Sequence, residues 1–170
     1  MSSKTTKITI TALFAAIITV MTAYVCHIPV GVNGGYIHLG DTFIYIAAVF
    51  LPRPYALAAA AIGGGMADLL TAPMWAPATI IIKMLIVLPF TSKEGKILST
   101  RNRIAPWIAF VISAVGYYLA EGILFGTFIA PLVSMSGSFI QSFGSAIAFY
   151  ALSAAFDKAG IKVKAGSYVS

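Results

Sequence analysis

The sequence predicts an all-α integral membrane protein, a compact bundle of six transmembrane helices with both termini in the cytoplasm. The first observation behind this prediction is composition: hydrophobic residues make up 59% of the 170 residues and charged residues only 9%. A soluble domain carries about 25% charged residues, so this chain lacks the polar surface needed to face water. The second observation is the alternating placement of its basic residues. The length fits one domain, which we predict to cover residues 1–170.

Six apolar stretches account for the predicted spans, since a spanning helix needs roughly 17–25 mostly apolar residues. We expect helices at residues 8–26, 39–51, 54–70, 75–90, 104–128 and 134–156. The first stretch is too long for the apolar core of a secretory signal peptide, so it is expected to be a permanent helix. The second and fourth are short, which indicates a thin bundle or a partly re-entrant segment.

Lys and Arg residues fall in alternate connections. They precede the first span, separate the second from the third and the fourth from the fifth, and follow the sixth: Lys4, Lys7, Arg53, Lys93, Lys96, Arg101, Arg103, Lys158, Lys162 and Lys164. The opposite connections contain none. The positive-inside rule then places both termini in the cytoplasm and the chain, as a multi-pass protein, in the cytoplasmic membrane. The net charge of +6 is therefore a topology signal and does not indicate nucleic-acid binding.

Three of the polar side chains in the predicted spans lie well away from the span ends, where a charged group costs about 2.5–3.5 kcal/mol on insertion scales. Lys83, Glu121 and Gln141 are each about two turns below the outer end of their helix, so they reach a similar depth. They indicate a polar pocket that opens outward. The alternative is a Lys83–Glu121 ion pair that only locks the helices together, and both can hold at once.

Aromatic residues cluster at the same level. Trp75 opens the fourth span, and Tyr117 and Tyr118 lie one turn before Glu121. Such residues suit a planar ligand held between aromatic faces, although Trp75 alone also fits an interfacial aromatic belt. Adjacent helical residues point about 100° apart, so the two tyrosines are not expected to face the pocket together.

The connection at residues 26–41 is rich in glycine and carries polar side chains, among them Asn33, Tyr36, His38 and Asp41. It reads as a lid over the pocket. The alternative is an ordinary connection in which Asp41 caps the second helix. A metal site of His27, His38 and Asp41 is a further alternative, disfavoured because no single element fixes all three ligands.

Two patterns of small residues indicate close helix packing. Gly63, Gly64 and Gly65 precede Asp68 near the outer end of the third span, where Asp68 either bonds loop amides or lines the pocket. Ala12 and Ala16 form a small-xxx-small face on the first span, which fits either a partner helix or a neighbour within the chain.

Together these features resemble the substrate-binding S component of energy-coupling factor (ECF) vitamin transporters. The resemblance covers nearly the whole chain. It rests on the six spans, the Ala12/Ala16 motif, the stretch Gly-Tyr-Ile-His-Leu-Gly-Asp ending at Asp41, the segment ending Ala-Asp-Leu-Leu at Leu70, and Trp-Ala-Pro-Ala-Thr-Ile-Ile-Ile-Lys ending at Lys83.

The resemblance implies a protein that captures a vitamin at the outer face, with the first connection as lid and the later helices lining the pocket. It implies that Ala12 and Ala16 dock on a transmembrane coupling subunit, which works with two cytoplasmic ATPases. ATP and Mg²⁺ would then bind in those partners, and no cofactor in this chain. The sequence agrees, because it has no Gly-x-x-x-x-Gly-Lys-[Ser/Thr] phosphate loop.

Within the family the chain looks most like members that take hydroxymethylpyrimidine, a thiamine precursor, or pyridoxine. Both ligands are small planar nitrogen heterocycles with hydroxymethyl groups. Glu121, Gln141 and Asp41 would bond ring nitrogen and hydroxyls. Metal-importing members carry a histidine after the initial methionine, whereas this chain has Ser2, which argues against metal cargo.

Three other function classes remain as alternatives. An independent channel or secondary transporter needs a coupling-ion path, yet the cytoplasmic half of the spans has no comparable acidic residue. An intramembrane enzyme needs a nucleophile with a base, or a metal, and the sequence has neither His-Glu-x-x-His nor Gly-x-Ser-x-Gly. A purely structural assembly subunit is the third alternative.

Overall fold

A computed structural model describes residues 3–25, 27–30 and 35–163 of the chain. The helices are α1 (Ser3–Ala23), α2 (Gly40–Phe50), α3 (Arg53–Thr71), α4 (Ala76–Leu85), α5 (Thr100–Phe125) and α6 (Ala130–Lys158). A short 3₁₀ turn, η1 (Pro73–Trp75), leads into α4, and two short strands, β1 (Ile28–Val30) and β2 (Gly35–Ile37), lie between α1 and α2.

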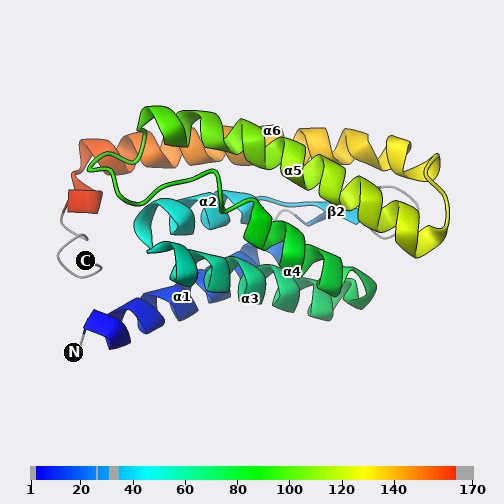
Figure 1. The fold of residues 1–170 in the computed structure, drawn as a ribbon, viewed down its shortest axis with the longest axis horizontal. Coiled ribbons are helices and arrows are strands. Elements are labelled where there is room, and N and C mark those ends of the chain that lie inside the picture. The colour runs from blue at the N-terminus through cyan, green and yellow to red at the C-terminus, as the bar shows by residue number, and fades with distance from the viewer. Residues whose placement is uncertain (1–2, 26, 31–34, 164–170) are drawn as a thin grey trace.

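The six helices run alternately up and down the long axis of the bundle (Figure 1). In that view α1, α3 and α4 lie on one side, α5 and α6 lie on the other, and α2 lies between them. The start of α1 and the end of α6 are at the same end of the bundle, as is the connection between α4 and α5. The segments predicted to be cytoplasmic therefore lie together, as the alternating charge pattern requires.

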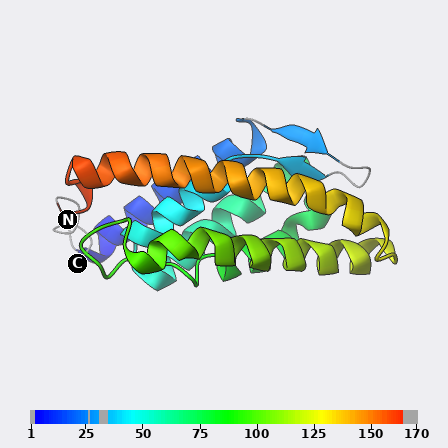
Figure 2. The ribbon, with the colours of Figure 1, turned by 90° about the horizontal axis from the view of Figure 1, so that it is seen from above.

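The strands form an antiparallel hairpin that pairs Ile28 with Ile37 and Val30 with Gly35. It lies along one side of the bundle beside α6, in the half away from the chain ends (Figure 2). The all-α prediction does not include this hairpin, since the sequence predicts only a connection at residues 26–41. Three-residue strands give too short an alternation of apolar and polar residues to be read from a sequence.

Most predicted helix boundaries hold to within a turn. The largest departures are at the start of the first helix, which begins at Ser3 instead of Ile8, and in the fourth span, which breaks into η1 and α4 and ends at Leu85, before the predicted end at Phe90. Turns follow α4, and the chain is irregular by Phe90.

Three described helices, α1, α5 and α6, contain stretches long and apolar enough to cross a membrane: Lys4–Ala23, Thr100–Phe125 and Ala130–Lys158. The shorter apolar helices are Gly40–Phe50 and Pro73–Leu85. The membrane fold is supported by these helices, while the count of six spans stays a prediction.

An aromatic cluster forms the core near the end of the bundle that holds the chain ends. The Tyr45 ring stacks on Phe90 with centroids 4.8 Å apart, and Phe149 meets both rings edge-on. All three side chains are buried. The cluster joins α2, the segment after α4, and α6.

The glycines of α3 allow two helices to approach it closely, as predicted. A Cβ on Gly63 would lie 2.6 Å from the Cβ of Ile18 on α1, and one on Gly65 would lie 2.7 Å from Ile80 on α4. Real Cβ contacts are essentially never below 3.0 Å. Glycine is therefore required at these crossings, which bring α1 and α4 against opposite sides of α3.

Candidate functional site

A buried ion pair crosses the interior between α2 and α4. Lys83 Nζ donates to Asp41 Oδ1 at 2.5 Å, and both side chains are only 1% exposed. Gln141 Nε2 on α6 donates to the other carboxylate oxygen of Asp41 at 3.0 Å. Each oxygen of Asp41 thus has a partner, and three helices that are distant in sequence meet at one carboxylate.

The observed partner of Lys83 is Asp41, whereas the alternative interpretation of the sequence paired Lys83 with Glu121. Asp41 lies in the first turn of α2, whose start makes no side-chain capping bond, so the capping alternative for Asp41 is also wrong. The carboxylate turns inward because a buried charge is costly unless it is paired and hydrogen-bonded. Asp41 is at a helix start and not two turns inside a span, so a match of depth along the spans does not predict it as the partner of Lys83.

Close backbone approach positions both members of the pair. A Cβ on Gly64 would lie 2.8 Å from Lys83 Cγ, so glycine in α3 makes room for the lysine stem. At the start of α2, the Gly40 amide donates to His38 Nδ1 at 2.9 Å. A Cβ on Gly40 would overlap the Thr22 hydroxyl of α1. These contacts fix the turn that carries Asp41.

His38 is 4% exposed and lies just before α2, beside the ion pair. Burial and, after it, the charge of Lys83 lower the pKa of His38 from 6.5 to about 3, against the opposing effect of Asp41. His38 is therefore neutral at pH 7. Because Nδ1 accepts from Gly40, the ring proton is on Nε2.

An aromatic wall adjoins the ion pair. Lys83 Nζ lies 5.4 Å from the centroid of the Tyr117 ring, within the range of a cation–π contact. The Tyr117 hydroxyl hydrogen-bonds with Thr79, at 3.0 Å. Trp75 contacts the Tyr117 and Phe125 rings with centroids 6.1 Å away in each case. The wall is built from η1, α4 and α5.

Glu121 lies one turn after Tyr117 on α5 and is 4% exposed. Residues four apart on a helix share a face, so Glu121 and Tyr117 both face the interior. Asp68 on α3 is 3% exposed. The carboxyl groups of Glu121 and Asp68 are thus inside the bundle, as their sequence positions predicted.

The two adjacent tyrosines diverge, as helical geometry predicted. Tyr117 faces Lys83, whereas Tyr118 packs against Phe128, with centroids 5.8 Å apart, and donates from its hydroxyl to the Phe128 carbonyl at 3.2 Å. Tyr118 therefore supports the α5–α6 connection. It is withdrawn from the candidate site, and Thr79 and Phe125, which sequence reasoning missed, join it.

The side chains of two predicted lid residues, Asn33 and Tyr36, are outside what the structure describes. Asn33 lies outside the described residues. Tyr36 pairs with Pro29 in the hairpin, and only its backbone is described. His27 Nδ1 lies 3.1 Å from the Thr22 carbonyl oxygen. In the described part of the chain, no group of three or more His, Cys, Asp or Glu residues is placed to hold a metal ion.

The small-residue face of α1 points outward. Ala12 and Ala16 are exposed, whereas Ala15 and Ile18, on the other face of the same helix, are buried against α3. Ile8 and Val20 extend the exposed stripe by one turn in each direction. Close packing within the chain thus uses Ala15, and the Ala12/Ala16 face is left uncovered by the described chain.

The sequence matches the family model described as ECF-type riboflavin transporter, S component, over residues 2–158. The chain belongs to this family. No individual curated protein is similar enough to the chain to be matched. Family membership makes the chain a substrate-binding subunit of an ECF transporter, and the family is one of transport proteins rather than enzymes.

S components work with a membrane coupling subunit and ATPases, and they take a small vitamin as substrate. The family and the apolar helices together make this a membrane protein. The resemblance drawn from the sequence is confirmed at this level.

Proposed function

We propose that this S component captures a small planar nitrogen heterocycle at its outer end and delivers it through an ATPase-driven coupling module. The observation that carries the proposal is the junction of an aromatic wall with a buried polar network. Trp75 and Tyr117 offer ring faces, and Lys83 joins Tyr117 to Asp41 and Gln141. Sites for planar ligands combine apolar walls with a few placed polar groups.

Glu121 and Gln141 are the side chains we assign to the ligand's polar edge. Both lie on the long helices α5 and α6, and both are buried. Lys83 is engaged by Asp41, so its role is to hold the network in place and to keep Tyr117 oriented. A ring nitrogen or hydroxymethyl group that hydrogen-bonds a buried carboxylate gains more than one bonded at a neutral group.

Hydroxymethylpyrimidine and pyridoxine remain the ligands we favour, with riboflavin, named in the family description, as the competing cargo. Trp75 already contacts both Tyr117 and Phe125. A ligand ring has to displace one of these aromatic contacts, and a single ring displaces less than three fused rings.

Docking on the coupling subunit is assigned to Ala12 and Ala16. Their exposure on α1, flanked by Ile8 and Val20, supports this assignment. Because neither side chain is larger than a methyl group, a partner helix can approach the backbone closely, and such close packing favours helix association in lipid. The outer site and the docking face use different residues.

An independent channel or secondary transporter is the second candidate function. It is less well supported, because the buried polar side chains Asp41, Lys83 and Gln141 hydrogen-bond to one another. Membership of the S-component family also favours the coupled mechanism.

Calorimetric titration of the purified chain in detergent tests the ligand assignment. The parent is titrated separately with hydroxymethylpyrimidine, pyridoxine, riboflavin, thiamine and biotin. Glu121→Gln should weaken binding of the cargo by about tenfold or more, since a hydrogen bond to a charged group is worth about 1.5–3 kcal/mol. Trp75→Ala should weaken it by a similar factor through lost ring contact.

Matched controls are available at the other end of the bundle. Glu94 is an exposed carboxylate and Trp107 is half-exposed, so Glu94→Gln and Trp107→Ala should bind like the parent. Tight binding of riboflavin alone would reverse the choice of cargo. Failure of every compound to bind the folded parent would contradict the proposal.

A further inference from the structure

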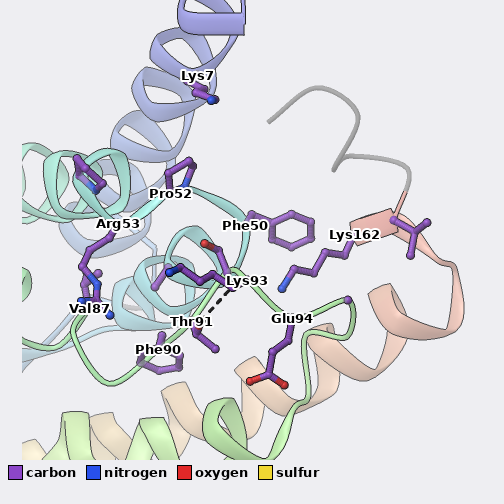
Figure 3. A pocket seen from close by; sticks show the side chains of 15 residues that line it. Lys7, Phe50, Pro52, Arg53, Val87, Phe90, Thr91, Lys93, Glu94 and Lys162 are labelled. Carbon is purple, nitrogen blue, oxygen red and sulfur yellow. Dashed lines mark hydrogen bonds between the residues drawn. The ribbon is translucent and has the colours of Figure 1, made fainter. Parts of the chain in front are cut away.

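A cavity of about 810 Å³ opens at the end of the bundle that holds the chain ends. It shares no residue with the site around the Lys83–Asp41 pair. Its walls come from α1, the α2–α3 turn, the connection after α4, and the segment after α6 (Figure 3). The vitamin site therefore does not explain it.

The charge of the lining is strongly unequal. Lys7, Arg53, Lys93 and Lys162 contribute four cations, whereas Glu94 is the one acidic residue among the lining residues. These cations come from four separate segments, so they are not a solvated run on one helix. Converging cations of this kind fit an anion.

Among these cations, Lys162 gives the strongest indication of a bound anion. Its Nζ is buried and has no hydrogen-bond partner among the described residues. Burial lowers the pKa of Lys162, while Asp157 and Glu94 oppose the shift. Figure 3 shows the side chain reaching from the C-terminal segment toward the loop that carries Lys93. A buried ammonium without a partner is costly, and an anion in the cavity would supply one.

Side-chain hydrogen bonds hold the loop wall in place. Asn102 bonds the amide and carbonyl of Thr91, at 2.8 and 2.9 Å, and Asp157 accepts from the amides of Ile97 and Leu98. Arg101 bonds the carbonyls of Leu88 and Pro89. Lys93 is thus presented by a fixed backbone, which lowers the ordering cost of binding.

The floor of the cavity is apolar. Phe50, Val87 and Phe90 line it beside the cations. A free inorganic anion has no apolar part that would contact such a surface, whereas a phospholipid carries its phosphate directly beside glycerol and acyl chains. Basic pockets between transmembrane helices on the cytoplasmic side bind anionic head groups.

We propose that this cavity binds the phosphate of an anionic phospholipid from the cytoplasmic leaflet, with Arg53, Lys93 and Lys162 around the phosphate and Phe50 and Phe90 beside the glycerol. The proposal uses the topology inferred from the charge pattern, which places this end in the cytoplasm. It is independent of the vitamin and adds a lipid ligand to the chain.

Native mass spectrometry of the full chain tests the proposal with defined lipids. The parent is titrated with phosphatidylglycerol, with phosphatidylcholine of the same acyl chains, and with inorganic phosphate. We expect one tightly bound phosphatidylglycerol. Arg53→Gln and Lys162→Gln should each weaken it by about fivefold, since a basic residue near an anionic surface is worth about 1 kcal/mol.

Lys96→Gln is the matched control, because Lys96 is an exposed lysine in the same loop that does not line the cavity. It should bind phosphatidylglycerol like the parent. Equal weakening by Lys96→Gln and Lys162→Gln would overturn the proposal, as would equal binding of phosphatidylcholine. Inorganic phosphate that displaces the lipid at similar concentration would overturn the assignment to a lipid. Thermal midpoints without lipid confirm that each variant is folded.

Discussion

At the scale of single residues, the main feature of the interior is the buried ion pair of Asp41 and Lys83. Each is almost inaccessible, and their pairing is what makes a charged lysine tolerable inside an apolar helix. Gln141 completes the arrangement by bonding the second carboxylate oxygen. The pair therefore joins α2, α4 and α6, and it also sets the position of Tyr117 through the cation–π contact.

A double-mutant cycle should reveal this coupling. Lys83→Met leaves the Asp41 carboxylate buried without its counter-ion, and we expect a loss of about 3–5 kcal/mol in the free energy of unfolding. Asp41→Leu should cost a similar amount. The double variant should be more stable than either single variant, because no uncompensated charge remains. Denaturant titration in detergent measures the three values, and additive losses would contradict the coupling.

His38 should make stability dependent on pH. Its pKa is about 3 in the folded chain and 6.5 when unfolded, so the unfolded chain binds the extra proton between these values. Stability is then fully present above about pH 6.5 and falls as the pH is lowered. At about pH 5 the loss is about 2 kcal/mol.

Thermal unfolding in detergent at about pH 7 and about pH 5 measures this effect. The midpoint of the parent should fall at the lower pH, and His38→Gln should remove most of the fall. Asp41, Lys83 and His27 are the other titratable groups that act on His38, and they are the same in both proteins. An equal fall in parent and variant would assign the pH dependence to another group.

Helix crossings decide the geometry at the scale of elements. Gly63 faces Ile18 and the Ala15 carbonyl of α1, and there is no space for even one methyl group. We expect Gly63→Ala to cost about 1–3 kcal/mol through overpacking, because backbone lies on one side of the new methyl group. The thermal midpoint in detergent measures the loss.

Gly95 is the matched control for this substitution. A Cβ at Gly95 would meet nothing within 4 Å, and the residue lies in an exposed loop. Gly95→Ala should leave the midpoint unchanged. A similar change in both variants would show that the close approach of α1 to α3 does not govern stability.

Apolar length predicted the helices because, in a membrane, hydrophobicity and helix formation are coupled by the need to satisfy every backbone group. The α2 and α3 boundaries were predicted almost to the residue for this reason. The short hairpin and the break after Leu85 were not predictable, because each covers too few residues to give a period.

The sequence predicted which residues belong to the candidate site better than it predicted which of them contact one another. Buried polar groups in apolar stretches identified Lys83, Glu121 and Gln141, and all are buried in the structure. The pairing of Lys83 with Asp41 depends on how α2 and α4 pack, which no local pattern encodes. Tyr118 was included among the candidate site residues because helical geometry excludes one of two adjacent tyrosines from the pocket but does not indicate which one.

At the scale of the whole molecule, the surfaces to which we assign functions lie in separate places. The hairpin and the start of α4, which carries part of the aromatic wall, lie in the half of the bundle away from the chain ends, the basic cavity is at the end that holds them, and the Ala12/Ala16 face is on α1. A subunit that binds cargo at one end and a coupling partner along its side needs this separation, since each contact can then form without disturbing the other.

Vesicle uptake tests the central claim most directly. The chain is reconstituted with its coupling subunit and ATPases, and accumulation of the cargo identified by titration is followed with and without ATP. We predict uptake only with both partners and ATP. Ala12→Leu/Ala16→Leu should abolish uptake while leaving cargo binding intact, whereas Ala151→Leu, at an exposed alanine on α6, should have no effect. Uptake by the chain alone, without partners or ATP, would contradict the account and identify an independent transporter.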